Sequence, residues 1–599
     1  MANKSDTFWY KAIISFSLLF FLQIFAPFFK GGLFLGHDSQ LHLIYLKHFE
    51  KTFKAGQIPV RIIDWFNPGY NQPLFNFYQP GVNYLYLIPR FLGVPPAQSV
   101  EVTVLALWLL SAVLMFAFTR RHFGTLGGIL AAYFYLIAPY HILDIFVRSA
   151  LPEFTALAFA PGIFWALKSY SDTQKGPYLT LLAFFVAATT ISHPPTLIMF
   201  SPFIVGYLLY LLYQQKSFSL LWPTLLSISV GFGLISFFIL PAFFEQKYVQ
   251  TIYMRSGYYD FHNHFVCLPQ LFIPRWEHGT SQIGCADKIS FQLGIVHWLV
   301  VLMAATILIA RFNVKGKVFK KTAVIDIESL KPDHYLLITI CLGSIFLYLY
   351  MTLPVSLPIW ENLPYIAYIQ YPWRFLAPTI FLSSFLSGGV ILIFKANPYR
   401  YLAFVILILS AAVAYNNYLK PIAYAQREEI NFGNEILHES ITGIKNLYPE
   451  PGYMPKWTQI LPAETDTPEN EVRVATQEAK VNSSKLSAAR KEYEITVEKP
   501  TVARFYTHYF PGWQVKVDDK TQNPLIDNIY GYMDIELAPG EHQVTLSFKN
   551  TPIRSLANIL SLNFLLVSLA LAFLFGTKTL TGKPKSITQS SKNSLNGRI

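Results

Sequence analysis

The sequence predicts a mainly α-helical, multi-span integral membrane protein, with about twelve transmembrane helices and an extracytoplasmic β-sandwich domain. Three observations predict this fold class. Only 14% of the 599 residues are charged and 53% are hydrophobic, whereas a soluble domain carries about 25% charge. The apolar residues form runs of roughly 18 to 22, long enough to cross a bilayer as a helix. One long polar insert near the C-terminal end alternates apolar and polar residues, as β-strands do.

The same composition excludes several classes of protein. Polar side chains are too scarce to cover a water-soluble particle of this length, and the apolar runs exclude a disordered chain. Three cysteines are too few for a secreted module built on disulfides. The net charge of +12 reflects the loops in which Lys and Arg concentrate, so it gives no reason to expect nucleic acid as a partner.

The predicted spans are apolar runs separated by polar or basic loops. We expect them at residues 12–29, 100–118, 125–140, 153–167, 177–192, 195–213, 220–243, 292–310, 335–352, 375–394, 401–416 and 557–576. A long polar stretch, and no small-residue cleavage site, follows the first run, so we interpret that run as an uncleaved anchor. The positive-inside rule then places both termini in the cytoplasm.

This topology divides the chain into four parts. We expect residues 1–416 to form the transmembrane domain with outer loops 30–99 and 244–291, residues 417–556 an extracytoplasmic β-rich domain, residues 557–576 the last transmembrane helix, and residues 577–599 a basic cytoplasmic tail. Within the insert, alternation predicts strands at 493–497, 513–517, 533–537 and 544–548, with turns at 518–519 and 538–541.

Asp38 follows the first predicted span and precedes a helical pattern. Two interpretations are open. Asp is a leading N-cap residue, so Asp38 can simply begin this helix. A carboxylate at the membrane surface can also take a proton from an acceptor hydroxyl. His37 and His42 flank Asp38 and are candidates for substrate binding.

The rest of the first outer loop interleaves aromatic residues with Asn, Gln, Gly and Pro. Its candidate substrate-binding residues are Arg61, Tyr70 and Tyr78. Aromatic faces stack on the C–H groups of sugars while amides bond their hydroxyls. The same residue types also anchor proteins at the membrane interface, so the composition leaves both interpretations open.

Ionisable residues cluster in the turn between the third and fourth predicted spans, at Asp144, Arg148 and Glu153. Charges at membrane depth are costly and mark function by default. Asp144 and Arg148 stand four residues apart, so a structural ion pair on a helix explains them equally well, and Glu153 is then a second acid. His193, at the outer end of the fifth predicted span, is a candidate to bond a phosphate or a backbone carbonyl.

The sequence Tyr371-Pro372-Trp373-Arg374-Phe375 precedes the tenth predicted span. Arg374 is the one Lys or Arg in the loop 354–374. A guanidinium group binds phosphate through two parallel hydrogen bonds, so Trp373 and Arg374 are candidates for binding an anionic headgroup. Snorkelling of the Arg374 side chain to the membrane surface is the alternative.

The remaining metal-ligating residues predict no zinc site. His262, His264 and Cys267 match no closed tetrahedral set. Cys267 and Cys285 lie in the same outer loop and are expected to form a disulfide, while Cys341 falls within a predicted span.

Several of these motifs resemble one family of bacterial membrane proteins, labelled 6-pyruvoyl-tetrahydropterin synthase-related membrane protein, and this resemblance implies a bacterial-type plasma membrane as the location. The resemblance covers roughly residues 10–400 and rests on motifs that recur in order, at 36–38, 56–61, 69–73, 75–80, 148–153, 192–194 and 371–375. The label implies no pterin chemistry here, because the chain has no soluble synthase-like domain. The insert, with Phe510-Pro511-Gly512-Trp513 and the residues 538–542, resembles the C-terminal domain of YfhO-like proteins.

Both groups are similar to GT-C glycosyltransferases, whose hallmark is an acidic residue in the first outer loop, the place of Asp38. The resemblance implies inverting transfer of a hexosyl or pentosyl group from a polyprenyl-phosphate donor in the membrane lipid to an extracytoplasmic glycan, lipid or protein. It makes Asp38 the catalytic base and has Arg148 or Arg374 neutralise the departing phosphate. Glu153 is then a second catalytic acid, which with His193 orients donor or acceptor.

Two points stay open at this stage. Many GT-C enzymes have two adjacent acids where this chain has His37-Asp38, so the sequence leaves a requirement for a divalent cation, Mg²⁺ or Mn²⁺, undecided. The alternative function is a transporter or flippase of a lipid-linked glycan. It requires polar residues along a path between the two membrane faces, whereas the ionisable residues concentrate at the outer ends of the predicted spans.

The first prediction concerns topology. The asymmetry of Lys and Arg between loops places residues 417–556 outside the cell, so a cysteine introduced at Ser483 should react with a membrane-impermeant thiol reagent in intact cells. The measurement is labelling before and after lysis. Labelling seen only after lysis would contradict the predicted membrane topology, including the extracytoplasmic position of Asp38.

Overall fold

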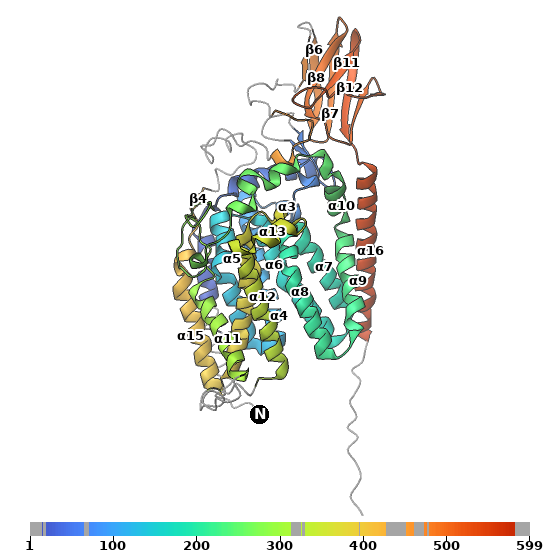
Figure 1. Cartoon of the computed structure of the whole chain (residues 1–599). Helices are drawn as coiled ribbons and strands as arrows, with labels where there is room; N and C mark the ends of the chain where they lie inside the picture. Colours follow the sequence, from blue (N-terminus) through green and yellow to red (C-terminus); the bar gives the residue numbers. More distant parts are fainter. Residues whose placement is uncertain are drawn as a thin grey trace, which may run out of the picture.

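The computed structural model confirms the fold class: the chain is mainly helical, and a separate β-sheet domain stands on one end of the helical part (Figure 1). It describes residues 15, 19–64, 71–312, 325, 330–394, 396–426, 451–460, 472–475 and 479–581. Most of the predicted tail 577–599 therefore lies outside the described residues.

The helical part consists of long helices joined by short helices and turns. The helices that correspond to predicted spans are α4 (Pro96–Ile137), α6 (Leu151–Thr173), α7 (Pro177–Ser192), α8 (Pro194–Gln215), α9 (Leu221–Leu234), α10 (Ser236–Glu245), α11 (Ile295–Phe312), α12 (Pro332–Thr352), α14 (Leu376–Val390), α15 (Asn397–Tyr415) and α16 (Pro552–Thr581). The helices in the connecting segments are α2 (Ser39–Lys54), α3 (Gly81–Phe91), α5 (Pro139–Leu143) and α13 (Leu357–Asn362).

Every predicted span overlaps a helix of the structure. By length and hydropathy, 6 of the described helices are able to cross a membrane, and a pair bent by 73° (Phe218–Leu234 with Ser236–Tyr248) would make a seventh. The predicted span 100–118 and most of the predicted span 125–140 lie in α4, which is kinked at Gly124 and ends at Ile137. The predicted span 153–167 corresponds to α6. The predicted spans 12–29, 177–192 and 292–310 correspond to the shorter apolar helices Leu19–Phe29, Pro177–Ser192 and Ile295–Arg311. The chain is thus a membrane protein with several spans.

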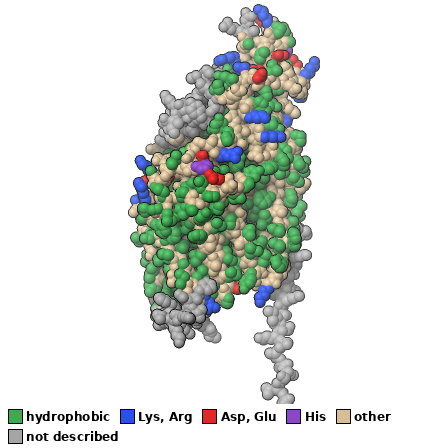
Figure 2. Space-filling view, viewed as in Figure 1, with side chains coloured by type: hydrophobic (Ala, Val, Ile, Leu, Met, Phe, Trp, Pro, Cys, Tyr) green, Lys and Arg blue, Asp and Glu red, His purple; other side chains and the backbone are tan. Residues whose placement is uncertain are grey.

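Hydrophobic side chains are spread over the visible face of the helical part, whereas charged side chains are more frequent on the β-sheet domain and near its junction with the helices (Figure 2). The helix α14 is buried along its whole length. Glycines allow it to approach α4 closely, because a Cβ on Gly388 would lie 2.6 Å from the carbonyl oxygen of Gly127. This central helix begins at Leu376, two residues after Arg374.

Two antiparallel sheets form the β-sheet domain, with strand orders β10-β9-β12-β7-β6 and β11-β8-β5. The strands are β5 (Val472–Val474), β6 (Lys480–Ser487), β7 (Arg490–Val497), β8 (Thr501–His508), β9 (Trp513–Val517), β10 (Lys520–Gln522), β11 (Tyr532–Leu537) and β12 (Gly540–Phe548). Apolar side chains of both sheets, among them Tyr493, Phe505 and Val544, share one core. Alternation correctly predicts β7, β9, β11 and β12.

The predicted turn at Asp518-Asp519 joins β9 to β10. Both residues have positive φ, +50° and +61°, as the two-residue hairpin turn with matching twist requires. Two small strand pairs lie outside this domain: β1 (Leu33–Leu35) with β4 (Ala423–Ala425), and β2 (Ile63–Asp64) with β3 (Asn71–Gln72).

A buried ion pair joins the β-sheet domain to the helices. Arg554, in the first turn of α16, donates from Nε to Oε2 of Glu245 at the end of α10, over 2.9 Å. The Arg554 side chain is fully buried and lies over the rings of Phe510 and Phe548, at 5.1 and 4.7 Å. Both rings belong to the β-sheet domain, so the guanidinium group of Arg554 connects α16, α10 and the β-sheet domain.

We expect Arg554→Met to destabilise the protein strongly, because it leaves the buried Glu245 carboxylate without its cation, at a cost of about 3–5 kcal/mol. The measurement is thermal unfolding of the purified protein in detergent. Arg490→Met is the control, since the half-exposed pair with Glu492 contributes about 0–1 kcal/mol. Equal small shifts for both variants would contradict the importance of the buried pair.

Candidate functional site

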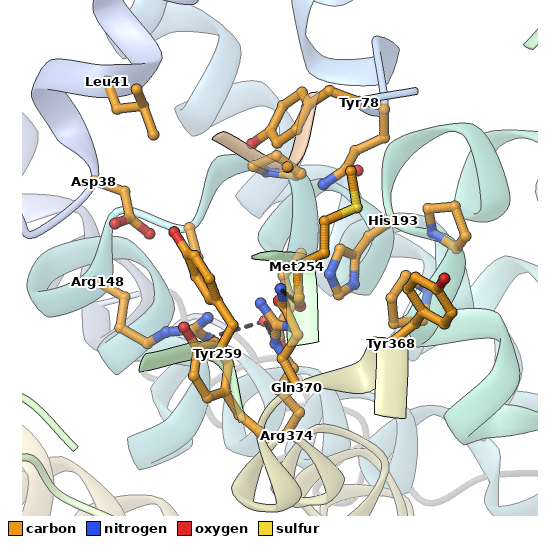
Figure 3. Close-up of a pocket in the computed structure, with 18 of the residues that line it drawn as sticks. Asp38, Leu41, Tyr78, Arg148, His193, Met254, Tyr259, Tyr368, Gln370 and Arg374 are labelled. Carbon is orange, nitrogen blue, oxygen red and sulfur yellow. Dashed lines mark hydrogen bonds and ion pairs between the residues drawn. The ribbon is translucent and has the colours of Figure 1, made fainter. Parts of the chain in front are cut away.

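A cavity of about 550 Å³ lies where several loops and helix ends meet. Its wall comes from segments far apart in the sequence, and side chains such as Asp38, Arg148, His193 and Arg374 point into the same space (Figure 3). Most of the sequence-predicted site residues line it: His37, Asp38, His42, Tyr78, Arg148, Glu153, His193, Trp373 and Arg374.

Backbone pairing holds Asp38 beside the turn that carries Arg148. The N–H of His37 donates to the carbonyl of Val147, and the N–H of Asp38 to the carbonyl of Arg148, both at 2.9 Å. Gly36 permits this approach, because a Cβ there would lie 2.7 Å from the Val147 oxygen. The juxtaposition of Asp38 with Arg148 is therefore built into the main chain.

Asp38 occupies the N-cap position of α2, yet its side chain makes no capping hydrogen bond. No other described residue bonds its carboxylate. The N-cap interpretation thus holds for the position of Asp38 but not for its side chain. The carboxylate is available to a molecule in the cavity.

Two guanidinium groups and two carboxylates form a buried network at the cavity wall. Arg148 donates from Nη1 to Oε2 of Glu153 at 2.9 Å and pairs with Asp144, as the sequence spacing indicates. Arg374, 221 residues after Glu153, donates from Nε to the same Glu153 oxygen at 3.1 Å. Tyr140 donates to Oε1 at 2.7 Å. The formal charges cancel, and both Glu153 oxygens are occupied.

The main chain around this network is unusual. Asp144–Arg148 is a single π-helical turn that ends at Ser149, whose φ is +54°. Such turns are rare and occur frequently at functional sites. Arg374 lies in the turn Pro372–Phe375 and is only 9% exposed. Its bonds are directed inward, so the structure does not favour the snorkelling alternative.

Both guanidinium groups keep N–H donors for a ligand. The hydrogen bonds of Arg148 use Nη1, and those of Arg374 use Nε and Nη1. Among the described residues the Nη2 groups have no partner, and neither is enclosed by protein. Arg148 lies over the Trp373 ring at 4.5 Å, and Arg374 over the Tyr371 ring at 4.7 Å. An anion in the cavity thus meets donors from two side chains.

The histidines of the wall differ in their surroundings. His193 is buried and bonds the Thr196 hydroxyl through Nδ1 at 2.8 Å, not a backbone carbonyl. Burial lowers the pKa of His42 to about 4, although the nearby Asp38 favours the protonated form, so His42 is neutral at pH 7. His37 is exposed, and its Nε2 lies 2.8 Å from the carbonyl of His278.

Two predicted binding residues are not part of this wall. Arg61 is buried at the junction with α16, where it donates to the Oδ1 atoms of Asn76 (3.1 Å) and Asn558 (2.8 Å). The structure therefore gives it interdomain contacts and does not bring it to the cavity. Tyr70 lies outside the described residues.

Sequence reasoning missed several residues of the wall, notably Tyr258, Tyr259, Gln370, Tyr371 and Tyr453. The abundance of Tyr in the loop 244–291 is the signal for the first two. Burial raises the pKa of Tyr258, so its hydroxyl stays protonated at neutral pH. Nothing in the sequence indicates that Tyr453, from the insert, contacts Tyr78 in the cavity wall, with ring centroids 5.9 Å apart.

The carboxylates near the cavity do not fit a divalent cation site. Guanidinium groups already pair with Asp144 and Glu153, and Asp38 has no second carboxylate beside it. Among the described residues no group of three His, Cys, Asp or Glu side chains is arranged to hold a metal ion. Cys267 and Cys285 form the expected disulfide.

The fold and the site define a multi-helix membrane protein with a charged cavity, and comparisons with known proteins add little to that class. No protein-family model matches the chain. An uncharacterized protein of Lactococcus lactis subsp. cremoris (strain MG1363) is 23% identical over 239 residues, which is 37% of this chain and 38% of that protein. The arabinofuranosyltransferase AftD from Mycobacteria is similar with a TM-score of 0.37 and 15% identity, over 69% of this chain and 27% of that chain. At this level neither similarity carries an argument about activity.

Proposed function

We propose that the protein is a membrane glycosyltransferase that transfers a sugar from a polyprenyl-phosphate donor to an acceptor hydroxyl. The observation that carries this proposal is the cavity itself, where the unbonded carboxylate of Asp38 shares a wall with the N–H groups of Arg148 and Arg374. Such a site pairs a base with an anion-binding group, the two functions that glycosyl transfer from a phosphate requires.

In the proposed reaction, Asp38 takes the proton of the acceptor hydroxyl as the hydroxyl oxygen attacks the anomeric carbon. The bond between that carbon and the donor phosphate breaks, and its electron pair leaves on the phosphate oxygen. Arg148 and Arg374 stabilise the negative charge that develops there. Attack opposite the leaving group inverts the anomeric centre. Glu153 acts by holding both guanidinium groups, since each of its oxygens is already bonded.

The donor in this proposal lies with its headgroup in the cavity and its prenyl chain in the surrounding lipid. Ile198 of α8 and Ala242 of α10 belong to the cavity wall, and Ile198 is 51% exposed. An apolar residue that faces both the cavity and the outer surface suits a lipid-linked substrate. The acceptor is an extracytoplasmic glycan, lipid or protein, and the sugar is a hexose or a pentose.

The flippase alternative is less well supported. At the end of α6 remote from the cavity, Lys168 and Arg121 pair with Asp172. Between the two charged regions, fully buried rings pack against one another: Phe118 lies 4.6 Å from Phe385 and 5.9 Å from Phe381. A path for a polar glycan would have to open this aromatic cluster.

We place the protein among the GT-C glycosyltransferases, in the group labelled 6-pyruvoyl-tetrahydropterin synthase-related membrane protein, with a YfhO-like domain at residues 417–556. The sequence motifs support this placement. We further propose a bacterial plasma membrane location, because the motifs resemble bacterial membrane proteins, and a cytoplasmic position for both termini, because of the distribution of Lys and Arg.

Asp38→Asn should express and unfold like the wild type but transfer sugar at least about a hundredfold more slowly. Asn is an equally good N-cap residue, and no capping bond is lost, whereas an amide cannot accept the proton. The measurement is single-turnover transfer from a radiolabelled polyprenyl-phosphate sugar in detergent, beside thermal stability.

Asp260→Asn is the matched control for this experiment. Asp260 is also an N-cap residue, its side chain does accept from the N–H of His262, and it is not part of the cavity wall. We expect this variant to keep normal transfer. Near-normal transfer by Asp38→Asn would remove Asp38 from the mechanism and with it the main support for the proposal.

Arg374→Lys should lower the use of donor by at least about tenfold, because an ammonium group cannot bond Glu153 and a ligand through a planar fork. The measurement is kcat/KM for the donor, obtained from initial rates over a range of donor concentrations. Arg90→Lys is the control, since Arg90 bonds Glu50 through two nitrogens at 2.9 Å but does not line the cavity. If Arg374→Lys and Arg374→Ala both retain full transfer, Arg148 alone binds the phosphate.

A further inference from the structure

The main chain is strained at Gln370, in the cavity wall. Gln370 has φ +67° and ψ −46°, and the N–H of Tyr371 donates to the carbonyl of Ile369 at 2.7 Å. This is the rare form of γ-turn with positive φ, which L-residues adopt only under strain. It directly precedes the turn that carries Trp373 and Arg374.

Glycine would adopt this φ at no steric cost, so the presence of Gln indicates a role for its side chain. The amide has two partners. Its Oε1 accepts from Nη1 of Arg374 at 3.2 Å, and its Nε2 donates to the carbonyl of Met254 at 2.8 Å. Met254 belongs to the turn Thr251–Arg255 on another part of the cavity wall. Gln370 therefore connects Arg374 to a segment more than a hundred residues earlier in the sequence.

The effect on Arg374 is geometric. Its Nη1 donates to the Ile369 carbonyl at 2.7 Å as well as to the Gln370 amide, and its Nε donates to Glu153. The γ-turn places the Ile369 carbonyl and the Gln370 side chain on the same guanidinium nitrogen. With Nε and Nη1 held, rotation of the guanidinium plane is restricted, and Nη2 makes no bond to these partners.

We propose that Gln370 is a positioning residue for the anion-binding site: its strained turn and side-chain amide hold the Arg374 guanidinium so that Nη2 is presented to a phosphate headgroup in the cavity. This inference rests on the proposed function, since it takes the ligand of Arg374 to be the phosphate of a prenyl-linked donor. Gln370 acts through Arg374 and does not itself contact the reacting atoms.

The test measures binding of farnesyl phosphate to the full chain in detergent, followed by tryptophan fluorescence, with farnesol as the uncharged probe. Gln370→Gly keeps the positive φ without strain but removes both side-chain bonds. We expect this variant to bind farnesyl phosphate about tenfold more weakly than the wild type, or about 1.4 kcal/mol. Its affinity for farnesol and its thermal midpoint should be unchanged.

Gln174→Gly is the matched control. Gln174 also has positive φ, +55°, ends α6 and is not part of the cavity wall, so the same substitution should leave both affinities unchanged. Unchanged binding of farnesyl phosphate by Gln370→Gly overturns the positioning role. Equal losses for both probes, with a lower thermal midpoint, overturn it too, because they identify a purely structural residue. A wild type that binds both probes equally contradicts the anion site itself and hence the proposed function.

Discussion

The bonds of one carboxylate, Glu153, to two arginines organise the cavity. Burying a single charge in a membrane protein is costly, and removing one partner of a buried pair exposes that cost in full. Here Arg148 and Arg374 balance Glu153 and Asp144, so the cluster is neutral while the Nη2 groups keep their bonding capacity. Asp38, Trp373 and the start of α14 all lie next to these arginines.

The main chain on either side of this network is adapted to it. Next to Arg148, a π-turn and a residue with positive φ allow the Gly36–Asp38 segment to bond the turn through its backbone. Next to Arg374, the γ-turn at Gln370 brings the Ile369 carbonyl and the Gln370 side chain to the Arg374 guanidinium group. Unfavourable local conformations persist only where surrounding contacts over-determine them, and both of these border the cavity.

A second arginine–carboxylate cluster joins the β-sheet domain to the helices. Arg554, Glu245, Asn76 and Arg61 form a chain of contacts between α16, α10 and the first loop. The segment 451–460 of the insert contacts both the cavity and the β-sheet domain: Gly452 and Tyr453 belong to the cavity wall, and the N–H groups of residues 459 and 460 donate to the carbonyl of Ile529. The β-sheet domain is therefore connected to the cavity wall as well as to the last helix.

The sequence by itself determined the elements whose physics is local. Apolar runs of bilayer length located the helices, period-two alternation located β7, β9, β11 and β12, and isolated charges pointed to Arg148, Glu153 and Arg374 of the cavity wall. The sequence could not distinguish Arg61, which bonds Asn558 at the junction with α16, from the arginines of the cavity wall. It also did not indicate that Tyr453 belongs to that wall, or that Gln370 positions Arg374. Only the tertiary structure decided those, because hydrogen bonds between residues over a hundred positions apart, and a strained φ that long-range contacts impose, leave no periodic signal in the chain.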